Sequence, residues 1–158
     1  MKIVKANYDN KAHCQIICDL MDHYAQDPMG GGETLAKEAL GNLVSGLRTF
    51  GKATTFLAYD NDKAIGLINC ILGFSTFKAK TLMNIHDVIV KDGYRGKGVT
   101  QVMLKAAEEF AVELGCCKLT LEVLEGNAPA IRAYKKFGFD GYELDPKMGK
   151  AMFWEKKL

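Results

Sequence analysis

The chain has 158 residues, the size of one ordinary domain, and this is long enough to form a core without disulfides or a metal ion. Hydrophobic residues make up 48% and charged residues 25%, which is typical of a globular protein rather than a disordered or fibrous one. The formal net charge of +2 argues against a broad nucleic-acid-binding surface, and no apolar run reaches the roughly 18 residues of a membrane span.

The first part of the chain predicts a strand, two helices and a hairpin. Residues 2–5 form the strand, and apolar residues at helical spacing then predict a helix that begins after Asp9. A breaker cluster at 27–32 ends this helix, and the apolar stripe from Leu35 to Leu47 predicts a second one. Two β-rich runs follow and predict strands at 54–59 and 64–74, joined by a turn at 60–62.

The second part predicts alternating strands and helices. A strand at 81–91 leads into a glycine turn and a helix that Gly115 stops, and a buried strand follows at 119–124. Asn127 caps a helix that runs to about Phe137, and two short strands, at 139–142 and 151–156, close the chain. These elements predict one mixed α/β domain over residues 1–158.

Five cysteines stand at positions 14, 18, 70, 116 and 117, without a Cys-x-x-Cys pair or a Cys/His ladder. Their odd number favours free thiols in a reducing compartment. The start of the chain reads as a strand and carries no apolar leader segment. We therefore expect a cytoplasmic protein without a metal site.

The segment from Val88 to Gln101 is the most informative one, because an apolar strand passes through a glycine-rich basic turn into a helix. Gly96 and Gly98 allow a tight turn and a close approach of the backbone to a ligand. The start of a helix attracts phosphate groups, and Arg95 with Lys97 adds full positive charges. The segment therefore predicts a site for a phosphorylated ligand.

Two common phosphate-binding motifs do not fit this turn. A P-loop requires Gly-x-x-x-x-Gly-Lys followed by Ser or Thr, whereas Lys97 is followed by Gly98 and position 91 is lysine. A Rossmann dinucleotide site requires Gly-x-Gly-x-x-Gly, and Gly96-Lys-Gly98 supplies only its first half, since position 101 is glutamine.

A third pattern fits, and two separate segments of the chain match it. Arg95-Gly-Lys-Gly-Val-Thr100 resembles the Arg/Gln-x-x-Gly-x-Gly/Ala signature of the GNAT acetyltransferase superfamily, and departs from it only at Thr100. The segment from Leu121 to Phe139 is similar to that family's second cofactor segment, in which a tyrosine follows an asparagine at a spacing of seven and a Gly-Phe pair closes the segment. The resemblance implies one domain with a mixed, mostly antiparallel sheet flanked by about four helices.

The resemblance implies an N-acetyltransferase that moves an acetyl group from acetyl-CoA, its co-substrate, to a primary amine within a ternary complex. The backbone of Val88, Ile89 and Val90 is then expected to pair with the pantetheine arm, and the Val88 N–H to polarise the thioester carbonyl. The expected pyrophosphate site is the backbone of Arg95, Gly96, Lys97, Gly98, Val99, Thr100 and Gln101. Asn127, Ala130 and Tyr134 complete the expected cofactor site.

Two side chains are candidates for proton transfer. Tyr134 occupies the position of the family's general acid, and a phenol is protonated at neutral pH, although a tyrosine on a helix face also serves in packing. His86 stands where some polyamine-acetylating relatives carry a glutamate, so it is the candidate base, with a structural histidine as the alternative. His86 and Asp87 cannot both face one site unless the strand contains a bulge.

The first helix and the loop after it carry several acidic groups and a histidine: Asp19, Asp22, His23, Asp27 and Glu33. They indicate either a pocket for a small or peptidic cationic amine or an ordinary solvated surface. A non-catalytic acyl-CoA-binding or sensing module on the same fold is the alternative to an enzyme, and a plain interaction module is a third possibility. By analogy with many relatives we expect a homodimer, with neither nucleic acid nor membrane as a partner.

Overall fold

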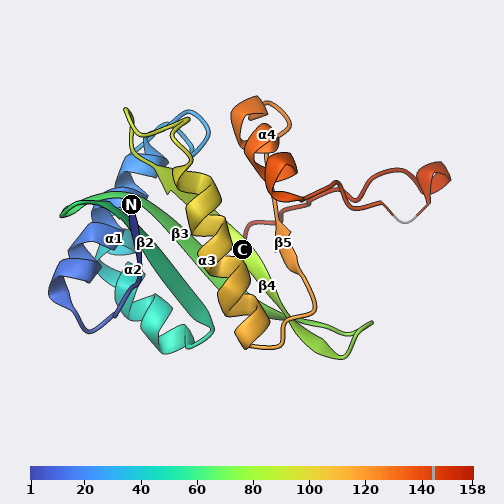
Figure 1. Ribbon diagram of the computed structural model, residues 1–158, viewed down its shortest axis with the longest axis horizontal. Coiled ribbons are helices and arrows are strands. Elements are labelled where there is room, and N and C mark those ends of the chain that lie inside the picture. The colour runs from blue at the N-terminus through green and yellow to red at the C-terminus, as the bar shows by residue number, and fades with distance from the viewer. Residues whose placement is uncertain (144) are drawn as a thin grey trace. The chain divides into compact units, whose positions relative to one another are not determined.

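The computed structural model describes residues 1–143 and 145–158 (Figure 1). Contacts group the chain into two units, Met1–Leu121 and Glu122–Leu158. The first unit holds β1 (Lys2–Lys5), α1 (Lys11–Ala25), α2 (Lys37–Phe50), β2 (Ala53–Asp60), β3 (Lys63–Ser75), β4 (Lys80–Val90), α3 (Val99–Glu113) and β5 (Leu119–Leu121). The second unit holds α4 (Ala128–Phe137) and the short 3-10 helix η1 (Pro146–Met148).

The strands of the first unit form one sheet in the order β1-β2-β3-β4-β5. All neighbours are antiparallel except β4 and β5, which are parallel. The expectation of a mixed, mostly antiparallel sheet is therefore confirmed. The hairpin between β2 and β3 turns at Asn61, whose φ of 51° is one that asparagine tolerates better than most residues.

Helices cover both faces of this sheet. Successive strand residues point to opposite sides, so each strand can pack against both layers of helices. Leu57 faces α1 and α2, where it belongs to a buried cluster with Ile17, Leu20, Val44, Leu67 and Ile89. Its neighbour Phe56 faces α3, and its ring meets that of Phe110 edge-on at 5.7 Å. Gly66 lets α3 approach closely, since a Cβ there would lie 3.3 Å from the sulfur of Met103. The core thus consists of two apolar layers, one on each side of the sheet.

The two strands expected at the end of the chain are not formed, so that prediction is wrong. Residues 139–142 and 151–156 adopt no strand, and a single bridge between Glu143 and Lys150 is present in this part of the described chain. Phe153 and Trp154 are both 80% exposed. β5 also ends at Leu121 instead of residue 124. Among the described residues, no helix is long and apolar enough to cross a membrane.

Candidate active site

A bulge interrupts β4 at the residue where the sequence places a base. Asn69 of β3 pairs with Asp87, but the next residue, Cys70, pairs with Ile85, so His86 is the extra residue on β4. His86 is exposed, whereas Ile85 is 2% exposed. Neighbouring strand residues can face the same site only at such a bulge, so His86 and Asp87 meet the condition stated from the sequence.

A chain of polar side chains runs across the sheet from Asp87, on the face covered by α1. Asn69 donates its Nδ2 hydrogen to Asp87 Oδ2 at 2.9 Å, and the Thr55 hydroxyl donates to Asn69 Oδ1 at 2.5 Å. The hydroxyl of Tyr8 lies 2.9 Å from that of Thr55. Asn69 and Thr55 are 3% and 1% exposed, so the bond between them is shielded from water, while the bonds to Asp87 and Tyr8 are half-buried. This chain of polar side chains was not predicted from the sequence, where its only local signal is one polar residue, Asn69, inside the apolar run of β3.

The glycine turn between β4 and α3 has the backbone that the sequence predicted. Gly96 and Gly98 have φ values of 75° and 83°, in the left-handed region that favours glycine. Gly98 is the N-cap of α3 and offers no side-chain cap, and the first turn of α3 holds no acidic residue. A Cβ at either glycine would meet no atom within 4 Å, so open space lies in front of the turn. The turn therefore fits an anionic group that approaches the backbone.

The side chain of Arg95 hydrogen-bonds to residues outside the glycine turn. Its Nη2 donates to Asp27 Oδ2 at 2.7 Å, and its Nε donates to the carbonyl of Val90 at 3.2 Å. The backbone N–H of Met29 also donates to Asp27 at 2.9 Å. The Met29 hydrogen bond and the Arg95 guanidinium hold the pKa of the Asp27 carboxyl below its usual value. Arg95 therefore links the glycine turn to the loop after α1.

The acidic residues of α1 border a hollow between α1 and α2 of about 490 Å³, which contains Asp19, Asp22 and His23. Asp22 accepts hydrogen bonds from the Leu35 N–H at 2.9 Å and from Gln26 at 3.0 Å. Three of the five predicted acceptor residues, Asp19, Asp22 and His23, are thus brought together. Asp27 is ion-paired with Arg95, and Glu33 does not line this hollow.

Asn127 and Tyr134 belong to the second unit, which is described by itself. Asn127 caps α4, because its side chain accepts from the Ala130 N–H at 3.2 Å. α4 ends at Gly138, whose φ is 110°. The ring of Tyr134 meets that of Phe139 edge-on at 6.0 Å. The expected cap and helix end are confirmed, and the catalytic role of Tyr134 stays a prediction.

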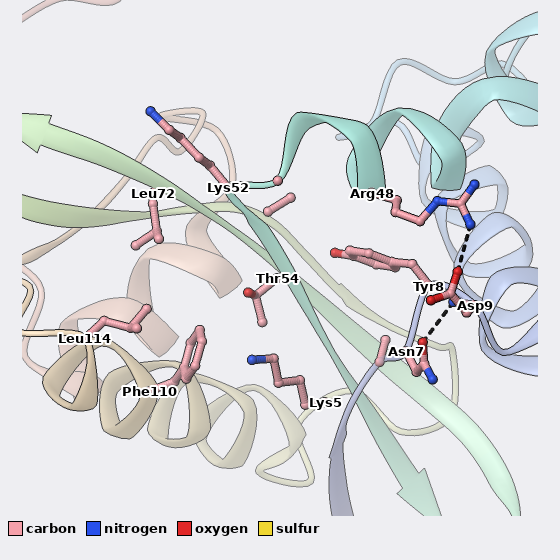
Figure 2. A pocket seen from close by; sticks show the side chains of 13 residues that line it. Lys5, Asn7, Tyr8, Asp9, Arg48, Lys52, Thr54, Leu72, Phe110 and Leu114 are labelled. Atoms are coloured by element: carbon pink, nitrogen blue, oxygen red, sulfur yellow. Dashed lines mark hydrogen bonds and ion pairs between the residues drawn. The ribbon is translucent and has the colours of Figure 1, made fainter.

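A larger hollow of about 660 Å³ lies at the open edge of the sheet, where β1 ends and β2 continues (Figure 2). Phe110 of α3 lies on one side of it and the Arg48–Asp9 ion pair, at 2.8 Å, on the other. Lys5 places its Nζ 4.0 Å from the centre of the Phe110 ring. This hollow is at the end of α3 that is far from the glycine turn. In the described part of the chain, no group of three or more His, Cys, Asp or Glu side chains could hold a metal ion.

Comparison with known sequences identifies acetyltransferases. The sequence model of the acetyltransferase (GNAT) family matches residues 18–139. Streptothricin acetyltransferase of Streptomyces lavendulae is 39% identical over 85 residues, which cover 52% of this chain and 45% of the relative. Spermine/spermidine N(1)-acetyltransferase of Bacillus subtilis is 41% identical over 68 residues, or 42% of this chain and 45% of the relative. The chain thus spans less than half the length of these curated relatives.

Solved structures of similar fold cover nearly the whole chain. The crystal structure of a probable acetyltransferase has a TM-score of 0.81 at 18% identity and covers 100% of both chains. The structure of AAC(6')-Iy in complex with the bisubstrate analogue CoA-S-monomethyl-acetylneamine has a TM-score of 0.78 at 15% identity, covering 99% of this chain and 98% of the other. At such identities the likeness establishes the fold.

Proposed function

Since this chain belongs to the GNAT acetyltransferase family, we propose that it transfers an acetyl group from acetyl-CoA to a primary amine. The matched region, residues 18–139, runs through the boundary between the two units at residues 121 and 122. This continuity supports a single domain that includes both units. The named activities of the relatives, on streptothricin and on spermine or spermidine, support an amine as the acceptor.

The glycine turn is the observation that carries the proposal. Left-handed Gly96 and Gly98 present their backbone to open space at the start of α3, directly after β4. In the proposed complex, the backbone from Arg95 to Gln101 binds the pyrophosphate of acetyl-CoA, and Lys97 adds positive charge. The backbone of residues 88–90 pairs with the pantetheine amides, which places the acetyl group beside the bulge.

The proposed chemistry is a direct attack of the amine nitrogen on the thioester carbon. The N–C bond forms, and the Val88 N–H stabilises the negative charge on the carbonyl oxygen. The C–S bond then breaks, and Tyr134 gives its hydroxyl proton to the departing CoA thiolate. His86, exposed at the bulge, takes the proton that the attacking nitrogen loses, directly or through water.

We further propose that the acceptor is a cationic amine. The hollow between α1 and α2 contains Asp19 and Asp22, and the nearby loop contains Asp27, which Arg95 already neutralises. Asp19 is exposed, whereas Asp22 is half-buried, and solvent screens a half-buried carboxylate less, so that it lowers the energy of a bound cation more. The expected homodimer and the cytoplasmic location stay predictions.

The deciding experiment measures the release of CoA thiol from acetyl-CoA with a panel of amines that includes polyamines, aminoglycosides, lysine analogues and peptides. Acetyl-amine formation with at least one of them, saturable in both substrates, is the expected result. Binding of acetyl-CoA without turnover on the whole panel would instead favour the non-catalytic acyl-CoA-binding module. Absence of acetyl-CoA binding would refute both functions.

A further inference from the structure

In the polar chain that ends at Asp87, the donor and the acceptor of each hydrogen bond can be assigned in only one way. Asn69 Oδ1 can only accept, so the Thr55 hydroxyl must donate to it. Thr55 Oγ1 has then used its hydrogen, and the 2.9 Å contact with Tyr8 requires the Tyr8 hydroxyl to donate. The last link is the donation from Asn69 Nδ2 to Asp87 Oδ2.

Asn69 cannot reverse its amide in this setting. Its second Nδ2 hydrogen points to the sulfur of Met21 in α1, 3.4 Å away, so each polar atom of the amide has a partner. A reversed amide would set its oxygen against the carboxylate of Asp87 and leave the Thr55 hydroxyl without an acceptor. A buried polar group without a partner is costly, so the Thr55 hydroxyl fixes the orientation of the Asn69 amide. The Asn69 amide in turn fixes the orientation of the Asp87 carboxylate.

Among the described residues, Asp27 has a cationic partner and Asp87 has none. Asp27 forms an ion pair with Arg95, whereas no described lysine, arginine or histidine lies within 4.0 Å of the Asp87 carboxylate. Burial, then the negative charge of Asp87, then that of Asp27 raise the pKa of the Tyr24 hydroxyl in α1. The negative charge of Asp87 is thus close enough to α1 to affect Tyr24. Asp87 is half-buried, and a half-buried carboxylate is stabilised by a cationic partner.

We propose that Asp87 binds a positive charge of the acceptor amine and that Asn69, held by Thr55, is the positioning residue for this carboxylate. The inference rests on the proposed function and adds a second cation-binding group for the acceptor, because Asp87 does not line the hollow between α1 and α2. The attacking nitrogen must be neutral, so the charge bound by Asp87 belongs to a second nitrogen. The acceptor class is therefore a diamine, a polyamine or another amine with a second ammonium group.

The test removes one hydroxyl without changing the volume of the side chain. Thr55→Val deletes the donor to Asn69, Thr55→Ser keeps it, and Thr54→Val makes the same change one residue away, on the other face of β2. Spermidine is the probe, and its dissociation constant is measured by calorimetry in the presence of CoA. We expect Thr55→Val to weaken spermidine binding about fivefold to tenfold, the size of one lost hydrogen bond. We expect Thr55→Ser and Thr54→Val to bind as the wild type does, and the acetyl-CoA dissociation constant to change less than twofold in every variant.

Asp87→Asn provides a second measurement in case Thr55→Val does not fold, because Asp87 is only half-buried. It should weaken spermidine binding more than Thr55→Val, again without loss of acetyl-CoA affinity. Wild-type spermidine affinity in folded Asp87→Asn, an equal loss in Thr55→Ser, or no saturable binding of spermidine by the wild type would overturn the inference. The readout is equilibrium binding, so a lack of turnover with all amines would refute the proposed function and leave this result interpretable.

Discussion

Arg95 of the glycine turn and Asp27 of the loop after α1 are joined by an ion pair, with Nη2 and Oδ2 2.7 Å apart. They are 68 positions apart in the sequence, and they connect the proposed cofactor turn with the loop on the acceptor side. The same guanidinium binds the carbonyl of Val90 at the end of β4. This charged pair therefore links the turn directly to the loop.

Asp27→Asn should reduce stability modestly and in a pH-dependent way. The Arg95 side chain is 54% exposed, so the pair contributes less than about 1 kcal/mol at neutral pH. The pKa of Asp27 is lowered in the folded protein, mainly by the Met29 N–H and then by Arg95, so its contribution is complete above the ordinary carboxyl pKa. The contribution is lost as pH falls through the lowered value.

The free energy of unfolding in urea, measured between pH 7 and pH 3, checks this. The difference between wild type and Asp27→Asn should shrink below about pH 4. Asp9→Asn is the matched control, because it breaks the more exposed Asp9–Arg48 pair. Measured by steady-state kinetics, its Michaelis constants should equal those of the wild type. An Asp27→Asn difference as large at pH 3 as at pH 7 would contradict the assignment.

Gly98→Ala should lower both stability and cofactor affinity. At φ 83° an alanine is strained by about 1–2 kcal/mol, and its methyl group would occupy the open space in front of the turn. We expect a lower free energy of unfolding and an acetyl-CoA dissociation constant at least tenfold higher. Gly46→Ala, inside α2 with no atom within 4 Å of the new methyl group, should instead stabilise by about 0.5–1 kcal/mol without changing acetyl-CoA affinity. Unchanged acetyl-CoA affinity in Gly98→Ala would argue against the turn as the pyrophosphate site.

Tyr134→Phe should lower kcat by about 100-fold or more, because the CoA thiolate would leave without a proton donor. The acetyl-CoA dissociation constant should stay within twofold of the wild type, since the ring and its edge-on contact with Phe139 are kept. Steady-state kinetics and calorimetry measure the two quantities. The same change at the exposed Tyr142 is the control, and equal kcat values for Tyr134→Phe and wild type would exclude the acid role.

His86→Gln should remove the acidic limb of the pH profile of kcat/KM. A base must be unprotonated to accept a proton, so the rate of the wild type should fall as the pH is lowered and the base becomes protonated. His86 is exposed at the bulge, so its replacement should leave the melting temperature nearly unchanged. His13, which accepts a hydrogen bond from the Asn7 N–H at the start of α1, gives a control in His13→Gln. An acidic limb that persists in His86→Gln would assign it to another group.

Local patterns predicted most of the first unit. Apolar residues at spacings of three and four positioned α1, α2 and α3, and breakers such as Gly115 and the cluster at 27–32 ended them close to the observed residues. The conformations of Gly96 and Gly98 were predictable as well, because only glycine adopts such φ values without strain. The two strands expected after α4 failed, since β-propensity describes a residue and a strand also needs an edge to pair with.

The sequence by itself determined the strand-turn-helix that presents backbone to a phosphate, and the asparagine cap of α4. Both depend on residues that are close together in the chain. Only the tertiary structure decided the bulge at His86, which arises from the register of β4 against Asn69 and Cys70. It also brought together Tyr8, Thr55, Asn69 and Asp87 from four separate segments. Such contacts follow from the pairing of distant strands, where a shift of one residue would point each side chain to the other face.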